Sequence, residues 1–188
     1  MDCRWLDIHS LCESRLYLID PTARIAQIHY FSALAHHLEK SRPGTVMRHT
    51  RYLDAINVSG IITHLGMFKP KDIRCHSPTC NVHLRRHEEK ETDVAIASAI
   101  VEAAAARECS AVALVSGDTD LVPALQTAHR IHPALKRYCF FPPYRSNRAF
   151  DACTDGRFKI APTQLPHHRL PDAVVGAGGR TIAKPEGW

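Results

Sequence analysis

The chain has 188 residues, of which 45% are hydrophobic and 23% charged, values typical of one folded domain with a short appendage. An odd number of cysteines (seven), no signal-peptide pattern and no apolar run near the roughly 20 residues of a membrane span argue against secreted and membrane proteins, so we expect a cytoplasmic one. The net charge of +5 favours phosphate-rich partners, but it is too small to identify a nucleic-acid-binding protein alone.

Helical and strand patterns alternate along most of the chain. In chain order we expect a helix in residues 5–16, a strand in 25–31, a helix in 46–58, a strand in 61–68, a helix in 92–106, a strand in 111–115, a helix in 121–129, a strand in 138–141, a short helix in 147–152 and a strand in 158–160. The run Ala111–Val115 is apolar without alternation, which is typical of a parallel strand covered on both faces. This order predicts an α/β fold with an open, mostly parallel sheet and helices on both faces.

The domain is expected to span residues 1–161, with a polar insert at 69–91 that carries basic, His and Cys residues. The tail, residues 162–188, is rich in Pro, Gly and Ala. We expect this tail to be loosely ordered, with Trp188 as a candidate to dock on the domain.

Two aspartates follow the apolar run of residues 111–115. Ligands of open parallel sheets bind beyond the carboxyl ends of the strands, where Asp118 and Asp120 can face one crevice. Mg²⁺ and Mn²⁺ suit such a place, because they take one or two carboxylates together with water and substrate phosphate. The same segment also suits a helix start, with Asp118 or Thr119 as the cap and Gly117 in the turn. The two roles are compatible.

A second acidic cluster, residues 88–93, lies where the next helix begins. Negative charge is favoured near a helix N-terminus, so Thr92 as cap and Asp93 in the first turn would explain this cluster without a binding site. Two such clusters at strand–helix junctions, expected on the same edge of the sheet, nevertheless favour a shared acidic site.

These two segments, Glu88–Val94 and Ala113–Leu121, resemble the signature of the NYN domain, a family of the PIN-like nuclease superfamily that includes LabA-like proteins. Residues 5–7, 28–31 and 142–146 are similar to further segments of the family. The resemblance implies a PIN-like fold and hydrolysis of phosphodiester bonds in single-stranded RNA, assisted by Mg²⁺ or Mn²⁺. The implied residues are Asp93, Asp118 and Asp120 for metal binding and catalysis and Ser116, Thr119 and Asn147 for substrate binding. Apart from the resemblance, the charges of Lys69, Lys71, Arg85 and Arg86 can guide the backbone of a single strand, although such charges more often form a solvated face.

Members of the family usually open with a strand that ends in Asp-Gly-x-Asn and supplies the first catalytic aspartate. This sequence has no such motif, and neither Asp2 nor Asp7 follows a buried strand. We therefore expect the domain in residues 1–161 to be N-terminally incomplete or divergent, with a gap where the central strand of the sheet lies. A chain with that gap should be marginally stable and nearly inactive.

Cys75, Cys80, His83 and His87 have a spacing that can surround a tetrahedral zinc ion, with the two histidines on one face of a helix. Their span is much shorter than that of a two-Cys two-His finger. The alternative is an exposed polar hairpin with unlinked thiols.

The sequence is compatible with three functions. The first is a Mg²⁺- or Mn²⁺-dependent endoribonuclease, which the two acidic clusters favour. The second is a catalytically silent RNA- or protein-binding module of the same fold, which the missing first aspartate favours. The third is an enzyme of other chemistry that uses the acidic site, because a fold does not fix a function.

Overall fold

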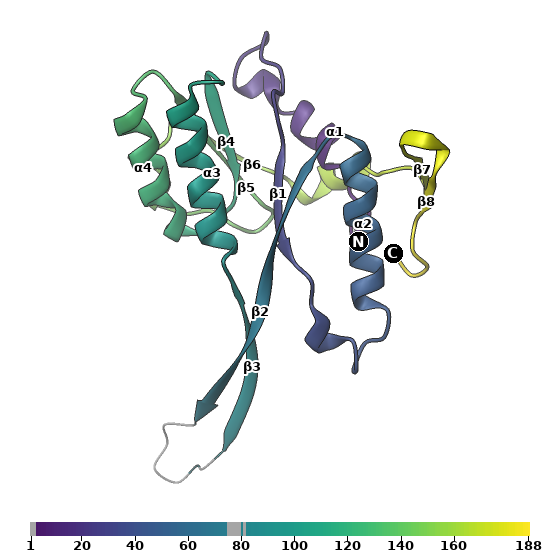
Figure 1. The fold of residues 1–188 in the computed structure, drawn as a ribbon. Coiled ribbons are helices and arrows are strands. Elements are labelled where there is room, and N and C mark those ends of the chain that lie inside the picture. Colours follow the sequence, from purple (N-terminus) through teal and green to yellow (C-terminus); the bar gives the residue numbers. More distant parts are fainter. Residues whose placement is uncertain (1–2, 75–79, 81) are drawn as a thin grey trace.

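The computed structural model describes residues 3–74, 80 and 82–188 (Figure 1). Its helices are α1 (Ile8–Glu13), α2 (Thr45–Val58), α3 (Thr92–Ala106) and α4 (Val122–Ile131). Its strands are β1 (His29–Ala33), β2 (Ile62–Arg74), β3 (His83–Lys90), β4 (Ala111–Val115), β5 (Lys136–Phe141), β6 (Gly156–Lys159), β7 (Ala173–Val175) and β8 (Thr181–Ala183). Three short 3₁₀ turns matter below: η2 (His36–Leu38), η3 (Thr119–Leu121) and η4 (Arg148–Phe150), the last in place of the helix expected at 147–152. No helix in this part of the chain is long and apolar enough to cross a bilayer.

The predicted α/β class is confirmed, but the sheet is divided into two. In one sheet β1 pairs with β2 in parallel and β2 pairs with β3 in antiparallel; in the other, β4, β5 and β6 run parallel in that order. Helix α3 contacts β1 and β2, and it also packs Ile100 and Ala104 into the core that contains Leu114 of β4. One helix therefore bridges both sheets. Within the described residues, β1 and β4 each pair along one edge only.

Strand β4 exposes one of its two faces. Leu114 is buried in the core beside α3 and α4, whereas Ala113 is exposed and Val115 is 49% exposed. The prediction that both faces of this strand are covered is therefore wrong for this structure. An apolar run without charge, bulge or proline is unusual at a sheet edge, which proteins normally protect. The composition of β4 thus fits a covered central strand better than the edge position that it occupies.

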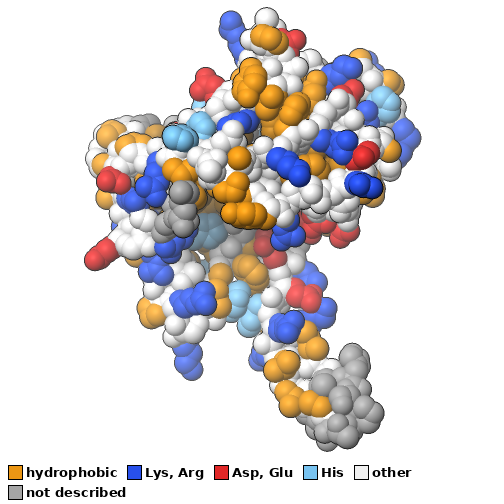
Figure 2. All heavy atoms as spheres, turned by 180° about the vertical axis from the view of Figure 1, so that it is seen from behind, with side chains coloured by type: hydrophobic (Ala, Val, Ile, Leu, Met, Phe, Trp, Pro, Cys, Tyr) orange, Lys and Arg blue, Asp and Glu red, His pale blue; other side chains and the backbone are white. Residues whose placement is uncertain are grey.

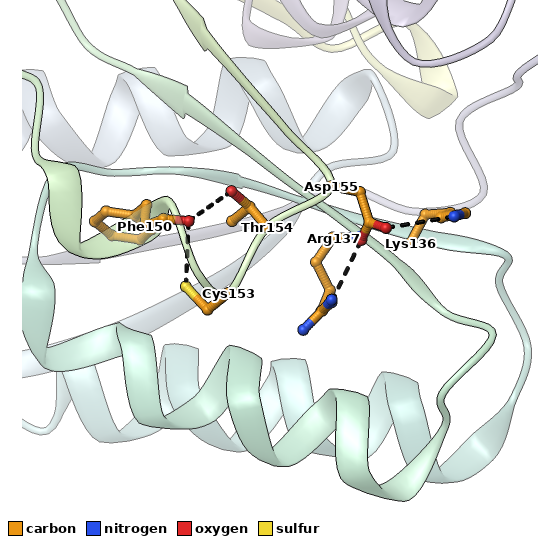
Figure 3. Close-up of polar contacts among 6 residues, drawn as sticks. All are labelled: Lys136, Arg137, Phe150, Cys153, Thr154 and Asp155. Atoms are coloured by element: carbon orange, nitrogen blue, oxygen red, sulfur yellow. Dashed lines mark hydrogen bonds and ion pairs between the residues drawn. The ribbon is translucent and has the colours of Figure 1, made fainter.

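Asp155, the residue just before β6, contacts Lys136 and Arg137 at the start of β5 (Figure 3). Its carboxylate accepts the backbone N–H of Arg137 at 2.9 Å and lies 3.4 Å from Arg137 Nε and 3.3 Å from Lys136 Nζ. Partial burial disfavours the charged carboxylate, but the hydrogen bonds and the two cations outweigh it, so the pKa of Asp155 lies below its ordinary value. Arg137 is itself only 9% exposed, so its charge depends on this partner.

We expect Asp155→Asn to lower the free energy of unfolding by about 1–3 kcal/mol at pH 7, because it leaves the buried Arg137 cation uncompensated. A lowered carboxyl pKa stabilises the fold above the unfolded-state value near 3.9, and this contribution is lost as the pH falls through the folded-state pKa. Thermal unfolding of both proteins at pH 7 and at pH 3 should therefore show a difference that shrinks in acid. The control is Asp72→Asn, since the exposed Asp72 lies 4.0 Å from Arg85 and such pairs contribute little. Equal losses in the two variants would contradict the assignment.

Strands β2 and β3 form a long antiparallel arm that extends away from the body (Figure 1). The first part of β2 pairs with β1, and the part from Met67 to Arg74 pairs with β3 from Lys90 back to His83. The described part of the polar insert is thus a hairpin, and the strand expected at 61–68 continues to Arg74.

The C-terminal tail is ordered, contrary to our prediction. Strands β7 and β8 form a hairpin in which Val174 lies opposite Ile182, and both side chains are buried in one cluster with Tyr52 and Leu53 of α2. Trp188 packs in the same cluster, with its ring centroid 5.9 Å from that of Tyr52. Because the tail is rich in Pro, Gly and Ala, its few apolar residues gave no clear signal of order in the sequence. Their burial depends on contacts with α2, which is distant in the chain.

Candidate acidic site

Besides the N-cap residue Glu91, four acidic residues lie near the N-terminus of α3. Glu89 is close to the end of β3, Asp93 is in the first turn of α3, and Asp118 and Asp120 belong to the segment between β4 and α4. Helix α3 contacts η3, which contains Asp120, so the two acidic segments lie on neighbouring elements. The fold therefore brings both clusters to one edge of the body.

The pKa of Asp93 reflects burial of the carboxyl and the proximity of the other carboxylates. Its pKa is raised above the ordinary value, first because burial of the carboxyl disfavours charge and then because Asp118, Asp120 and Glu89 repel it. Like charges that approach without a counter-ion are a feature of sites that bind cations or protons.

We expect Asp93→Asn to raise the melting temperature slightly in the presence of a chelator at pH 7. A raised carboxyl pKa in the folded state destabilises the fold as the pH rises through that pKa, and it has no effect below the unfolded-state value. The gain should stay within about 0.5 kcal/mol, as for other exposed substitutions, and should vanish at pH 3. Thermal unfolding measures it, with Glu108→Gln beyond the opposite end of α3 as the charge-matched control. A lower melting temperature for Asp93→Asn at pH 7 would refute the repulsion.

Asp118 is the cap of η3, as one of the two sequence interpretations predicted. Its Oδ1 accepts the backbone N–H of Asp120 at 3.0 Å, and its own N–H donates to Ser116 Oγ at 3.1 Å. Ser116 therefore shapes the loop, while Thr119 is the first residue of η3 and not its cap. One carboxylate oxygen of Asp118 is thus held by the backbone, which fixes the orientation of the other.

The start of α3 departs from the prediction. Glu91, not Thr92, is the N-cap, and Glu91 has a left-handed backbone with φ 78° and no capping side-chain hydrogen bond. Thr92 Oγ1 instead donates to Glu89 at 2.5 Å. The helix start also lies against Gly66 of β2, where a Cβ atom would come within 2.6 Å of Lys90 O and Thr92 Oγ1. Glycine at this position lets α3 approach the strand and so places Asp93.

Arg145 is a neighbour of the acidic loop that the sequence reasoning did not single out. A Cβ atom at Gly117 would lie 3.1 Å from Arg145 Cβ, so the glycine accommodates this side chain directly beside Asp118. The backbone N–H of Arg145 donates to Pro142 O at 3.1 Å, in a turn that follows β5. The Pro-Pro pair after β5 was the available signal, since it marks a turn at the carboxyl end of a strand.

Asn147 begins the short turn η4 and lines a cavity. Its Oδ1 accepts the N–H of Ala149 at 2.9 Å and caps η4. It lines a cavity of about 670 Å³ beside β6, together with Phe141, Ser146, Arg148, Asp151, Thr154, Asp155, Gly156, Arg157 and Lys159. The acidic residues of the α3 site do not line this cavity.

The possible zinc ligands are only partly described. Cys75 lies outside the described residues, and Cys80 is a free thiol. His83 and His87 lie on strand β3 and not on a helix, so the helical part of this prediction is wrong. Four residues span about 13 Å along a strand, whereas ligand nitrogens lie about 2 Å from zinc. The strand therefore does not bring the two histidines together as one turn of a helix would, and the ring of His87 stacks on His37 instead.

Metal-binding geometry is not complete in the part of the chain that is described. In residues 3–74, 80 and 82–188, no three His, Cys, Asp or Glu side chains are grouped closely enough to hold an ion. The carboxylates of the α3 site are neighbours, but no three of them are close enough to one another to hold a single ion.

Comparison with known proteins places the chain. The profile of the NYN domain matches residues 18–158. A crystal structure of a protein of unknown function, VPA0982 from Vibrio parahaemolyticus, is similar with a TM-score of 0.51 and 15% identity, and covers 90% of this chain and 92% of that one. At this identity the likeness concerns the fold alone. The hypoxanthine-guanine phosphoribosyl transferase of L. donovani aligns at 10% identity over 82% of this chain and 71% of that one, but its TM-score of 0.23 does not indicate a shared fold. The curated proteins gave no match. The match to the profile covers most of the sequence, and the chain belongs to the NYN domain family.

Proposed function

We propose that this chain is a Mg²⁺- or Mn²⁺-dependent ribonuclease unit that cleaves single-stranded RNA at the N-terminus of α3. The observation that carries the proposal is the position of Asp93 beside η3, where removal of the carboxyl from water and then the charges of Asp118, Asp120 and Glu89 raise its pKa. Membership of the NYN family supports the same assignment.

The donors suit a hard divalent cation. All of them are carboxylate oxygens, and the repulsion around Asp93 would be relieved by a positive ion. Mg²⁺ uses one or two protein carboxylates and completes its shell with water and substrate phosphate, so a site that lacks three converged ligands is still compatible with it. Asp93, Asp118 and Asp120 are the residues that would hold the ion.

The chain's own residues have separate tasks in this proposal. When bound, the ion supplies an activated water and offsets the charge that develops on the phosphate. Asp118 is oriented by the backbone of Asp120 and by Ser116, so it presents a fixed carboxylate oxygen. Arg145 beside Gly117 can pair with a phosphate of the substrate, which guanidinium groups bind in a bidentate manner.

The site also requires a further strand in this proposal. Strands β1 and β4 each have an unpaired edge among the described residues, and their common neighbour α3 carries Asp93. A parallel strand between them would end at the acidic site, as strands of open sheets do. We place the first metal-binding carboxylate of the family there, and we expect residues 1–188 alone to be nearly inactive.

A catalytically silent RNA-binding module is the second candidate. The observation that favours it is the absence, in the described residues, of three side chains placed to hold a metal. A titration with Mn²⁺ of the native chain and of Asp118→Asn separates the two functions, because the silent module binds RNA without binding the ion.

A further inference from the structure

The pairing of β2 with β3 places the cationic side chains of the arm on two opposite faces. Paired residues in an antiparallel ladder share a face, and successive residues alternate between faces. Lys71 lies opposite Arg86 and Lys69 lies opposite Glu88, so Lys69, Lys71 and Arg86 fall on the same side of the hairpin, together with Lys90. We call this side the cationic face. Arg85 lies on the other side, opposite Asp72.

The opposite side of the arm is partly covered by the body. His37 of η2 stacks on His87 with ring centroids 4.1 Å apart, and it meets Phe68 edge-on at 4.7 Å. The cationic face therefore points away from η2. Lys69 and Lys71 are more than half exposed there, and Leu84 is 48% exposed between the cations and the tip. Figure 2 shows Lys and Arg side chains on the arm, mixed with acidic and apolar ones.

The cations of this face are only partly neutralised. Lys71 and Lys90 share Glu88 at 2.5 and 2.9 Å, and Lys69 lies 3.6 Å from Glu91. Three of the four cations thus share two carboxylates, and the fourth, Arg86, forms no ion pair with any residue that the structure describes. The face keeps an excess of positive charge. On the side of the body it ends at Lys90, which precedes Glu91 and is three residues from Asp93.

We propose that the cationic face of the arm binds the phosphate backbone of single-stranded RNA and delivers the strand to the acidic site. This inference rests on the proposed function. Lys69 and Lys71 are two residues apart on β2, about 6.8 Å along the strand, and Arg86 lies opposite Lys71, so this part of the face presents neighbouring cations to a linear, repeating anion. The exposed apolar side chain of Leu84 offers contact to bases, and continuity with the acidic site favours the substrate as the partner over an acidic protein.

The test is RNA binding by the full chain in a chelator, measured by fluorescence anisotropy with a labelled oligouridine at several salt concentrations. The variant Lys69→Gln/Lys71→Gln/Arg86→Gln should weaken binding on the order of 10²-fold at 50 mM salt and lower the slope of log affinity against log salt by about 2. The matched control is Arg85→Gln on the other face, which should change affinity by less than about threefold. Far-UV circular dichroism checks that the exposed substitutions leave the fold intact.

Each outcome decides the inference. Equal affinity and slope for the triple variant and the native chain would overturn it, as would an equal loss in Arg85→Gln. Competition by polyglutamate as strong as competition by unlabelled RNA would reject RNA as the specific partner. Because RNA binding is measured in a chelator, it depends on neither the metal nor cleavage, so intact binding by a chain that neither binds Mn²⁺ nor cleaves would reject the nuclease and leave the arm in place.

Discussion

An additional parallel strand between β1 and β4, supplied as an N-terminal extension that ends in Asp-Gly-x-Asn, should turn a weakly stable and nearly inactive chain into a cooperative, RNA-cleaving domain. Among the described residues the two strands each have an unpaired edge, and Val115 of β4 is 49% exposed. Covering such side chains stabilises a fold by about 1.5–3 kcal/mol each. The aspartate of the extension would join Asp93 and Asp118, and we expect cleavage to rise on the order of 10²-fold or more.

Three proteins separate the packing effect from the chemical one. They are residues 1–188, the extended chain, and the extended chain with Asn in place of the motif's aspartate. Thermal unfolding and cleavage of a labelled single-stranded RNA with Mn²⁺ are measured for each. The Asn version should melt like the extended chain but cut like the short one. If residues 1–188 melt as sharply and cleave as fast as the extended chain, the unpaired edges are a stable feature and the placement of the strand is wrong.

Local sequence signals predicted the body of the fold well. The strand at residues 111–115 and the helix at 92–106 match β4 and α3, because an apolar run and an amphipathic period are properties of the segment itself. The helix at 46–58 was expected one residue short of α2. Exposure was harder to predict, since whether Val115 is covered depends on elements elsewhere in the chain.

Features that depend on tertiary contacts were missed. Val174 and Ile182 are buried only because the tail reaches α2, and nothing in the Gly-rich sequence around them indicates that contact. His83 and His87 are four residues apart, a spacing that puts two side chains on one face of a helix and also on one face of a strand. The spacing therefore could not show whether a helix brings the two histidines close together or a strand separates them by about 13 Å.

In the acidic site, too, some features could be predicted from the local sequence, whereas others depend on tertiary contacts. The Ser-Gly-Asp-Thr-Asp segment predicted a cap at Asp118 or Thr119, and the hydrogen bonds of Asp118 with Ser116 and Asp120 show that Asp118 is the cap. Arg145 was overlooked because its approach to Gly117 is set by the turn after β5, which is distant in sequence. Whether the carboxylates converge on an ion is a property of the whole assembly, and the sequence carried no direct signal for it.

Asp118→Asn should weaken Mn²⁺ binding about tenfold or more in a calorimetric titration and abolish metal-dependent cleavage by the extended chain. The substitution isolates charge from structure, since Asn caps a helix start as well as Asp and can keep the hydrogen bond to the N–H of Asp120. The matched control is Asp54→Asn in α2, where the carboxylate lies 3.5 Å from Arg180. That variant has the same change in net charge and should bind Mn²⁺ like the native chain. Equal binding by Asp118→Asn and the native chain would remove Asp118 from the site. Binding of RNA without binding of Mn²⁺ by the native and extended chains alike would leave the silent RNA-binding module as the function.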